Sequence, residues 1–304
     1  MTQQHIYKRR TLKREVHMKG IGLHSGERVC LNLIPAAAGH GLKIRSAKND
    51  ASRGSLIDVS PRSVTTTENA VTLTNGVWQI QTVEHILAAL ATHQITDLII
   101  EVDSEEMPVM DGSGQPFALA IVDAGIHEYA ASIEPIRINM PVWVVQGEKY
   151  LVALPHNGLR VTYTIDFPHP KLQGQSLSID LDPETLHKDI LPARTFGFLD
   201  DVEAMKSRGL IKGASTDNAL VLTKRGFYNR PRVDGECIRH KVLDLIGDLY
   251  LLGRPLEGHF IAHKAGHALD VALGNNILDQ FQSDELAVRR QNDNRLAAKM
   301  HGIL

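Results

Sequence analysis

The sequence is poor in cysteine, has no long apolar run and has no excess of either charge. Its 304 residues include only two cysteines, Cys30 and Cys237, which excludes a disulfide framework and a cysteine-ligated zinc site. No run reaches the roughly 18 apolar residues of a membrane-spanning helix. Lys and Arg total 33 against 35 Asp and Glu, a net charge of −2 that argues against phosphate-driven binding of nucleic acid. We therefore expect neither a transmembrane segment nor a nucleic-acid partner.

A signal peptide is also missing, because residues 1–14 are polar and basic and lack an apolar core. We therefore expect a cytoplasmic protein. Hydrophobic residues make up 43% and charged residues 22%, which is typical of a folded globular chain. Histidine is in surplus, with 15 residues. Histidine titrates near neutral pH and binds metals as the neutral imidazole, so this surplus points to proton transfer or to a metal site.

Two kinds of hydrophobic periodicity occur along the chain. Residues 159–165 and 27–33 alternate between apolar and polar, which predicts half-buried strands, and residues 97–102 predict a more buried one. Apolar stripes at helical spacing predict four helices: residues 82–90 with Thr82 as N-cap, 116–124 with Gly125 as the stop, 236–252 ending at Gly253, and 268–281.

Strands grouped apart from helices favour an α+β fold over a doubly wound parallel sheet. The chain length suggests two domains at about 150 residues each, and the same order of elements recurs in the two halves. Residues 128–135, just before a strand predicted at 135–145, form the natural boundary. We predict a first domain of residues 1–130 and a second of residues 131–304. No glycine-rich loop for binding nucleotide phosphates is present.

A polar stripe runs along the helix predicted at residues 236–252. His240, Asp244 and Asp248 follow one another at intervals of four and share one face, whereas the other positions are strongly apolar. Buried charges are costly unless they are paired or bind a metal, so a buried stripe needs one of these partners. The alternative is a solvated face, because a His/Asp pair at this spacing is common.

The helix predicted at residues 82–90 opens with Glu84 and His85. Taken alone, Glu84 is explained as a favourable charge at a helix N-terminus. Taken together, His85, His240 and Asp244 form a two-histidine, one-carboxylate set. Catalytic zinc uses this number of ligands and keeps a fourth position for water, and iron(II) oxygenases use a similar set. Glu84, beside a ligand, is placed like a general base.

Two further segments hold candidates for chemistry. His267 lies where the chain enters the helix predicted at 268–281 and is a candidate general acid, with a capping histidine as the alternative. Thr195 offers a hydroxyl beside two phenylalanines, with an ordinary strand end as the alternative. The glycine-rich residues 19–26 and 111–114 are too degenerate to interpret alone, and most of the other histidines lack a partner at a useful spacing.

Six segments in a fixed order, however, resemble one known family. They are residues 20–26 (GIGLHSG), 82–85 (TVEH), 108–113 (PVMDGS), 193–198 (ARTFGF), 240–244 (HKVLD) and 266–269 (GHAL). Together they span most of the chain and resemble the UDP-3-O-acyl-N-acetylglucosamine deacetylases. The chain departs from the family pattern around residues 191–192, 212–214 and 224–236, which concerns contacts to the acyl chain rather than the metal chemistry.

The resemblance implies a bacterial enzyme of lipid A biosynthesis with one zinc ion per chain. Its substrate would be a UDP-linked, 3-O-acylated N-acetylglucosamine, from which it removes acetate. The implied fold is two similar α+β domains, each a sheet layered against a pair of helices, with the active site at their junction. We expect a monomer.

The resemblance also implies roles for individual residues. His85, His240 and Asp244 would bind zinc, Glu84 would be an ionised general base, His267 the general acid and Asp248 the carboxylate that orients it. Thr195 would donate to the oxyanion, and the compact ammonium of Lys241 would meet the diphosphate. Phe196, Val202, Ile211 and Ser215 would line a passage for the acyl chain, and Leu23 would also contact the substrate.

Two other functions are weighed against this one. An iron(II) oxygenase would use the same ligands but usually holds them on the strands of a barrel, whereas all three fall in predicted helices here. A non-catalytic module that binds a sugar or a lipid would need neither Glu84 beside a ligand nor His267 with a carboxylate partner.

Overall fold

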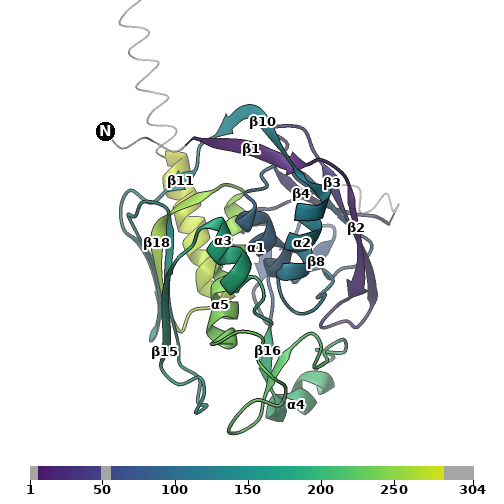
Figure 1. The fold of residues 1–304 in the computed structure, drawn as a ribbon, viewed down its shortest axis with the longest axis vertical. Coiled ribbons are helices and arrows are strands. Elements are labelled where there is room, and N and C mark those ends of the chain that lie inside the picture. Colours follow the sequence, from purple (N-terminus) through teal and green to yellow (C-terminus); the bar gives the residue numbers. More distant parts are fainter. Residues whose placement is uncertain (1–5, 49–55, 284–304) are drawn as a thin grey trace, which may run out of the picture.

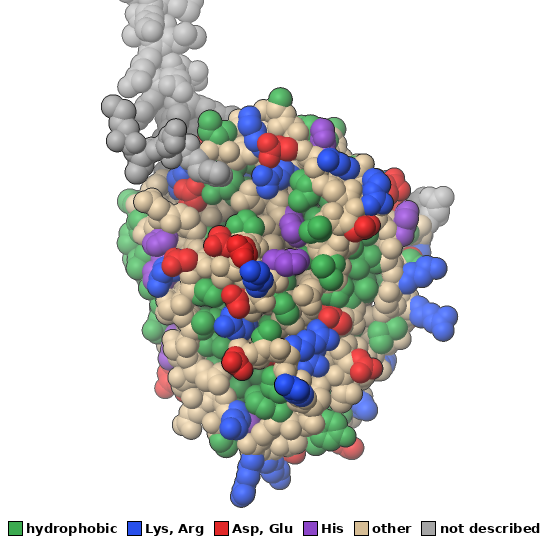
Figure 2. Space-filling view, in the orientation of Figure 1, with side chains coloured by type: hydrophobic (Ala, Val, Ile, Leu, Met, Phe, Trp, Pro, Cys, Tyr) green, Lys and Arg blue, Asp and Glu red, His purple; other side chains and the backbone are tan. Residues whose placement is uncertain are grey.

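The computed structural model describes residues 6–48 and 56–283, which form a mixed α+β fold. Two larger sheets lie on opposite sides of the molecule, and the main helices lie between them (Figure 1). Charged side chains of both signs are intermixed on the face drawn in Figure 2, in keeping with the small net charge. Among the described residues, no helix is long and apolar enough to cross a membrane.

The first large sheet comes from the N-terminal half and has the strand order β2-β3-β9-β4-β5. The central strand β9 pairs antiparallel with β3 and parallel with β4. Helix α1 (Glu84–Thr92) precedes β9, and helix α2 (Gln115–Ala124) follows it. The strands are β2 (Val16–Ile21), β3 (Arg28–Pro35), β4 (Leu42–Ser46), β5 (Ile57–Asp58) and β9 (Leu98–Val102), and a small separate sheet contains β6 (Val64–Thr66), β7 (Thr72–Thr74) and β8 (Gln79–Gln81).

The second large sheet has the order β12-β13-β18-β14-β15, with β11 also paired to β18. The central strand β18 pairs antiparallel with β13 and parallel with β14, so the two sheets share their pairing directions. Helix α5 (Glu236–Leu249) precedes β18, and a helix over residues 267–283 follows it. The strands are β11 (Ile136–Arg137), β12 (Val142–Gln146), β13 (Lys149–Leu154), β14 (Leu159–Ile165), β15 (Gln175–Asp180) and β18 (Leu256–His263).

Shorter elements connect β15 to α5. Helix α3 (Pro183–Thr185) leads into a helical turn at Leu186–Ile190. Strands β16 (Phe196–Phe198) and β17 (Leu220–Leu222) then pair in parallel, with helix α4 (Val202–Ser207) between them. In Figure 1 this unit projects at the lower end of the molecule, beyond the two sheets.

Helices α1 and α5 pack against each other at the centre of the molecule. Helix α1 is apolar or small on nearly all sides after its first turn, as expected for a helix buried between layers. The two backbones come very close at Gly247 of α5, where a Cβ atom would lie 2.1 Å from the carbonyl oxygen of Glu84. Glycine is therefore required at this helix crossing.

Several sequence predictions agree with the structure. The strand predicted at residues 159–165 is β14. The helix stops at Gly125 and Gly253 are confirmed, and both glycines have a positive φ, of 74° and 65°. The helix predicted at 268–281 lies within the one observed over residues 267–283.

The prediction that Thr82 caps α1 is wrong. The helix begins at Glu84 with Val83 in the capping position and no side-chain cap. Thr82 has a φ of 63°, a left-handed conformation rather than the extended one typical of an N-cap residue. Its hydroxyl lies 3.5 Å from a carboxylate oxygen of Glu106. The hydroxyl is therefore engaged away from the helix.

The stretch predicted as the domain boundary, residues 128–135, is largely a strand. It belongs to β10 (Ile126–Ile133), which pairs antiparallel with β1 (Tyr7–Leu12). The strand predicted at 135–145 is divided into β11 and β12, with Pro141 just before β12. Proline lacks an N–H for the ladder, which explains why pairing resumes only after it. The division into two domains at this point stays a prediction.

The close crossing of α1 and α5 predicts the effect of Gly247→Ala. The added methyl group would collide with the backbone of Glu84, so the helices must separate, at an expected cost of about 1–3 kcal/mol in the free energy of unfolding. Urea unfolding measures this cost. Gly226→Ala is the control, because a Cβ there meets no atom within 4 Å. Equal stability of the two variants would contradict the argument.

Candidate metal centre and active site

The three predicted metal ligands lie close together where α1 and α5 cross. His85 is in the first turn of α1, and His240 and Asp244 are one turn apart on α5. One ligand atom from each residue lies within 4.8 Å of the others. The Nε2 atoms of His240 and His85 lie 3.3 Å and 4.0 Å from Oδ1 of Asp244. All three side chains are buried, so the alternative of a solvated helix face is excluded.

The two histidines are suited to bind a metal because they are neutral. Burial, together with the nearby His240, lowers the pKa of His85 to about 3, and burial also lowers the pKa of His240. The Nδ1 of His240 lies 3.0 Å from the carbonyl oxygen of Ala193. With Nδ1–H donating to that carbonyl, the lone pair of Nε2 faces Asp244, which is the usual arrangement of a metal-binding histidine.

The carboxylate of Asp244 has a second partner in Lys241. The ammonium of Lys241 lies 2.7 Å from Oδ2 of Asp244, on the side away from the histidines. Burial alone would raise the pKa of Asp244, but His240 and Lys241 hold it well below the ordinary range. Asp244 is therefore an anion that leaves Oδ1 toward His85 and His240. Buried donors of this kind, two neutral and one anionic, fit a divalent metal ion.

One helical turn beyond Asp244, Asp248 forms a short hydrogen bond with His267. The Nδ1 of His267 lies 2.7 Å from Oδ2 of Asp248. Burial alone would lower the pKa of His267, but the charge and the hydrogen bond of Asp248 raise it to about 10. His267 is therefore an imidazolium near neutral pH, which is the state that a general acid requires.

Glu84, the neighbour of His85, is buried at the start of α1 and accepts a hydrogen bond from the backbone N–H of Val71 at 3.3 Å. Burial raises its pKa to about 7, a change that the cation of His267 opposes. Glu84 therefore exchanges its proton closer to neutral pH than an exposed glutamate does. Burial, the main cause of this shift, was not part of the expectation from sequence, which used the ordinary pKa of glutamate. Its role as an ionised general base stays a prediction.

A cavity of about 550 Å³ opens onto this cluster. Thr195 and Phe196 line it together with His240, Lys241, Asp244 and His267, as the sequence analysis expected. Sequence reasoning missed four further lining residues: Lys149, Asp166, Phe167 and Lys264. Lys149 begins β13, Asp166 and Phe167 follow β14, and Lys264 follows β18, so no single periodic pattern along the chain connects the three places. Phe167 packs edge-to-face on Phe196, with 5.7 Å between ring centres.

The other residues predicted for an acyl passage do not line this cavity, and neither does Leu23. Leu23 and Ile211 are buried in two loops that contact each other. The N–H of Gly213, in the loop of Ile211, donates to the carbonyl of Leu23 at 3.0 Å. On α4, Met205 lines the cavity rather than Val202. The structure therefore brings only Phe196 of this set to the reacting groups.

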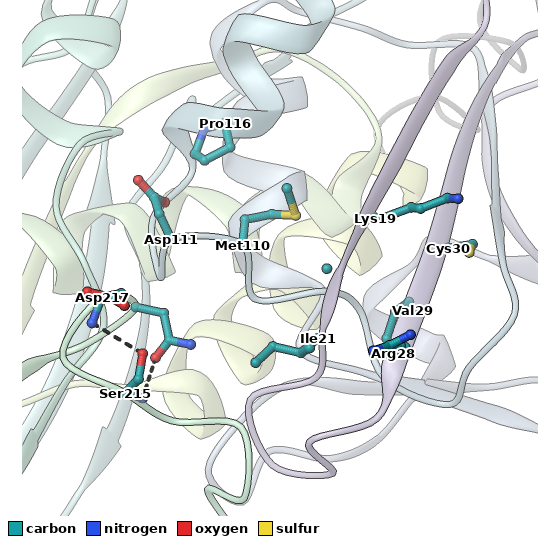
Figure 3. Close-up of a pocket in the computed structure, with 12 residues that line it drawn as sticks. Lys19, Ile21, Arg28, Val29, Cys30, Met110, Asp111, Pro116, Ser215 and Asp217 are labelled. Atoms are coloured by element: carbon teal, nitrogen blue, oxygen red, sulfur yellow. Dashed lines mark hydrogen bonds between the residues drawn. The ribbon is translucent and has the colours of Figure 1, made fainter.

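Ser215 lies instead in a second cavity of about 890 Å³. Figure 3 shows Ser215 on one side of this hollow, with Ile21 of β2 and Met110 across from it. The Ser215 hydroxyl accepts a hydrogen bond from the N–H of Asp217 at 3.2 Å, so it helps to hold the loop that it belongs to.

Comparison with known proteins agrees with this geometry. The family model of UDP-3-O-acyl N-acetylglycosamine deacetylase matches residues 9–279. A UDP-3-O-acyl-N-acetylglucosamine deacetylase of Leptospira biflexa is 52% identical over 285 residues, which cover 93% of this chain and 94% of that protein. The proteins of the same name from Myxococcus xanthus and Teredinibacter turnerae are 41% and 42% identical, over 94% and 92% of this chain and 91% and 92% of their own. The chain therefore belongs to the UDP-3-O-acyl N-acetylglycosamine deacetylase family.

Proposed function

We propose that this chain hydrolyses the N-acetyl group of a UDP-linked, 3-O-acylated N-acetylglucosamine and releases acetate, using one zinc ion held by His85, His240 and Asp244. As a member of its family it is a deacetylase of lipid A biosynthesis. The observation that carries the residue assignment is the buried triad, with Glu84 next to His85 in the chain and a charged His267 lining the same cavity as His240 and Asp244. A cytoplasmic location stays a prediction.

The active site is proposed to lie at the junction of two similar domains, residues 1–130 and 131–304. The equal strand orders and pairing directions of the two large sheets support this division. In each half, one helix precedes the central strand and one follows it. Helix α1 of the first half supplies Glu84 and His85, and α5 of the second supplies His240 and Asp244.

A zinc ion, when bound, would polarise the amide carbonyl and bring the pKa of a bound water to about 7. The side chains would then manage the protons. The Glu84 carboxylate would accept the proton of the attacking water. The hydroxyl of Thr195, which lines the same cavity, would donate a hydrogen bond to the oxygen that becomes negative.

Amide hydrolysis also needs a proton on the leaving nitrogen, because an amide anion is a poor leaving group. His267 would deliver this proton, and Asp248 keeps His267 charged until it does so. One water adds and one amide bond breaks, giving acetate and a free 2-amino group. The two proton-transfer groups are on different helices, and both are held next to the α1–α5 crossing.

Two sets of cavity residues suit the remaining parts of the substrate. Lys149 and Lys264 line the same cavity as Lys241 and are proposed to meet the diphosphate. The ammonium of Lys264 lies 2.8 Å from Asp166, so it would have to share its charge between that carboxylate and the substrate. Lys241 already contacts Asp244, so in this proposal it would serve the metal ligand and the substrate together. Phe167, Phe196 and Phe198 supply an apolar wall for an acyl chain.

The direct test is acetate release from UDP-3-O-acyl-N-acetylglucosamine by the zinc-loaded protein. We expect stoichiometric acetate and free amine. The rival iron(II) oxygenase would instead consume oxygen and need iron, and a binding module would retain the substrate unchanged. Both rivals leave the charged His267–Asp248 pair without a task. Binding without acetate release would refute the proposal.

The metal assignment predicts the effect of His240→Ala. Removing one of three ligands should abolish stoichiometric zinc binding and reduce activity to background, because two ligands do not hold zinc in a catalytic site. Metal analysis of the purified variant measures occupancy. His17→Ala is the control, since His17 is exposed on β2 and distant in sequence from the triad. Full zinc content in His240→Ala would remove this residue from the ligand set.

The proton-transfer assignment predicts a bell-shaped pH–rate profile. Activity falls at low pH as Glu84 is protonated, and because burial raises the pKa of Glu84, this limb should lie above the ordinary glutamate value of about 4.3. Activity falls at high pH as His267 loses its proton, above the ordinary histidine value of about 6.5, because Asp248 raises its pKa.

The variants Glu84→Gln and His267→Ala should each cost about 100- to 10,000-fold in rate. Each should also remove one limb of the profile, the acidic limb for Glu84 and the basic limb for His267, while zinc stays bound. A basic limb that persists unchanged in His267→Ala would show that another group delivers the proton.

The apolar wall predicts a strong dependence on the acyl chain. Burial of each methylene contributes about 0.8 kcal/mol, so the substrate without its 3-O-acyl group should have a much lower kcat/KM. Phe196→Ala should reduce kcat/KM for the acylated substrate and leave that of the unacylated one nearly unchanged. Equal turnover of the two substrates by the unaltered protein would refute the acyl site.

A further inference from the structure

Asp270 is a buried carboxyl that the proposed chemistry does not use. It lies three residues after His267 on the helix over residues 267–283, and it is 0% exposed. Neither of its carboxyl oxygens has a hydrogen-bond partner among the described residues. Most buried polar groups are hydrogen-bonded, so a carboxyl in this state calls for a physical explanation.

Asp270 adjoins the pair that supplies the proton in the proposed reaction. A carboxyl oxygen of Asp270, a carboxyl oxygen of Asp248 and a ring nitrogen of His267 all lie within 4.8 Å of one another. Oδ2 of Asp248 is bonded to His267, whereas its Oδ1 has no partner. The hydroxyl of Tyr163 on β14 is also buried without a partner in this region. The His267–Asp248 pair is therefore surrounded by buried polar groups to which the proposed reaction assigns no role.

The charges around Asp270 come from three elements. Helix α5 presents Lys241, Asp244 and Asp248, the helix of Asp270 itself presents His267, and β14 presents the hydroxyl of Tyr163. His267 faces the same α5 residues and, from α1, Glu84. Neither cation is bonded to Asp270, because Lys241 is bonded to Asp244 and His267 to Asp248.

Two buried carboxyls this close together cannot both ionise without a large cost. Asp248 is hydrogen-bonded to the His267 ring at 2.7 Å, so its charge has a partner. Asp270 has no such partner and therefore keeps its proton near neutral pH. Burial and the charge of Asp248 raise the pKa of Asp270 to about 8, well below the value of about 10 for His267.

We propose that Asp270 is a positioning residue that ionises in mildly alkaline solution and thereby keeps His267 protonated. As the pH rises, Asp270 loses its proton before His267 does. The new negative charge lies within a few ångströms of the imidazolium and stabilises it, so His267 loses its proton only at a still higher pH. The inference rests on the proposed role of His267 as general acid. By this effect, Asp270 would extend the pH range in which the enzyme is active to more alkaline values.

The test is Asp270→Asn in the zinc-loaded protein. Asparagine has nearly the same shape as the neutral acid but cannot ionise, so His267 should lose its proton at a pH lower by about one unit. The basic limb of the pH–rate profile should move by the same amount, and the acidic limb, set by Glu84, should stay. A basic limb at the same pH as in the unaltered protein would overturn the proposal.

Asp279→Asn is the matched control, because Asp279 lies on the same helix but is exposed and paired with Arg62. It should leave both limbs in place. An equal shift in this variant would show that any loss of negative charge on the helix acts at long range, and would overturn a specific role of Asp270.

A second measurement needs neither a variant nor a substrate. In the unaltered zinc-loaded protein, the NMR signals of the His267 ring should change in two steps, one when Asp270 ionises and one at higher pH when the ring loses its proton. A single step would overturn the proposal. Two steps in a protein that releases no acetate would refute the proposed function and leave the effect of Asp270 intact.

Discussion

The backbone contact between Gly247 and the carbonyl of Glu84 sets the spacing of α1 and α5, and the candidate site depends on that spacing. Helix α1 contributes Glu84 and His85, whereas α5 contributes His240, Asp244 and Asp248. Zinc–ligand bonds are only about 2 Å long, so a wider crossing would take His85 out of reach of the other two ligands. Gly247 is thus needed for the packing of the two helices and, in the proposed site, for bringing the zinc ligands together.

Burial then divides the acids of the site into two kinds. Asp244 is bonded to Lys241 and Asp248 to His267, so each of these two buried carboxylates has a cation at 2.7 Å. Glu84 and Asp270 have no cation at hydrogen-bonding distance among the described residues, and burial raises the pKa of both. Paired anions in a dry interior stay charged, whereas unpaired ones take up protons near neutral pH. In the proposed chemistry, the paired carboxylates would hold the metal and the general acid in place, and the groups that exchange protons lie beside them.

Local patterns in the sequence were sufficient for the parts of the site that share one element. The interval of four from His240 to Asp248 predicted one face of one helix, and the apolar surroundings predicted that this face is buried. The grouping of His85 with that face rested on the ligand count of a catalytic zinc site and on the resemblance to a family, because no periodicity links α1 to α5. Asp270, Lys149 and Lys264 were missed since their roles depend on which strand ends and helix turns meet in space.

Backbone conformation was the second limit on prediction from sequence. Thr82 looked like a helix cap by residue type, but its positive φ places it in a turn whose hydroxyl faces Glu106. Residues 128–133 were placed in the boundary between two halves because they follow a predicted helix and precede a predicted strand, yet they pair with β1 in a two-stranded ribbon. In both cases a distant segment supplies the partner, and local propensity contains no information about it.

The two halves place the start of their second helix differently, and this difference bears on where the proposed base and the proposed acid lie. In the first half, α2 follows Gly114, where a Cβ would lie 3.3 Å from the carbonyl of His85, so the start of α2 packs tightly on the backbone of α1. In the second half, the corresponding helix begins at His267, whose ring reaches Asp248 of α5. A side chain at Gly114 would meet both Leu191 and the backbone of α1, so this position can hold only glycine without a shift of its neighbours. In the proposed chemistry, the first half supplies its proton-transfer group from α1 itself, as Glu84, and the second supplies one from the helix after its central strand.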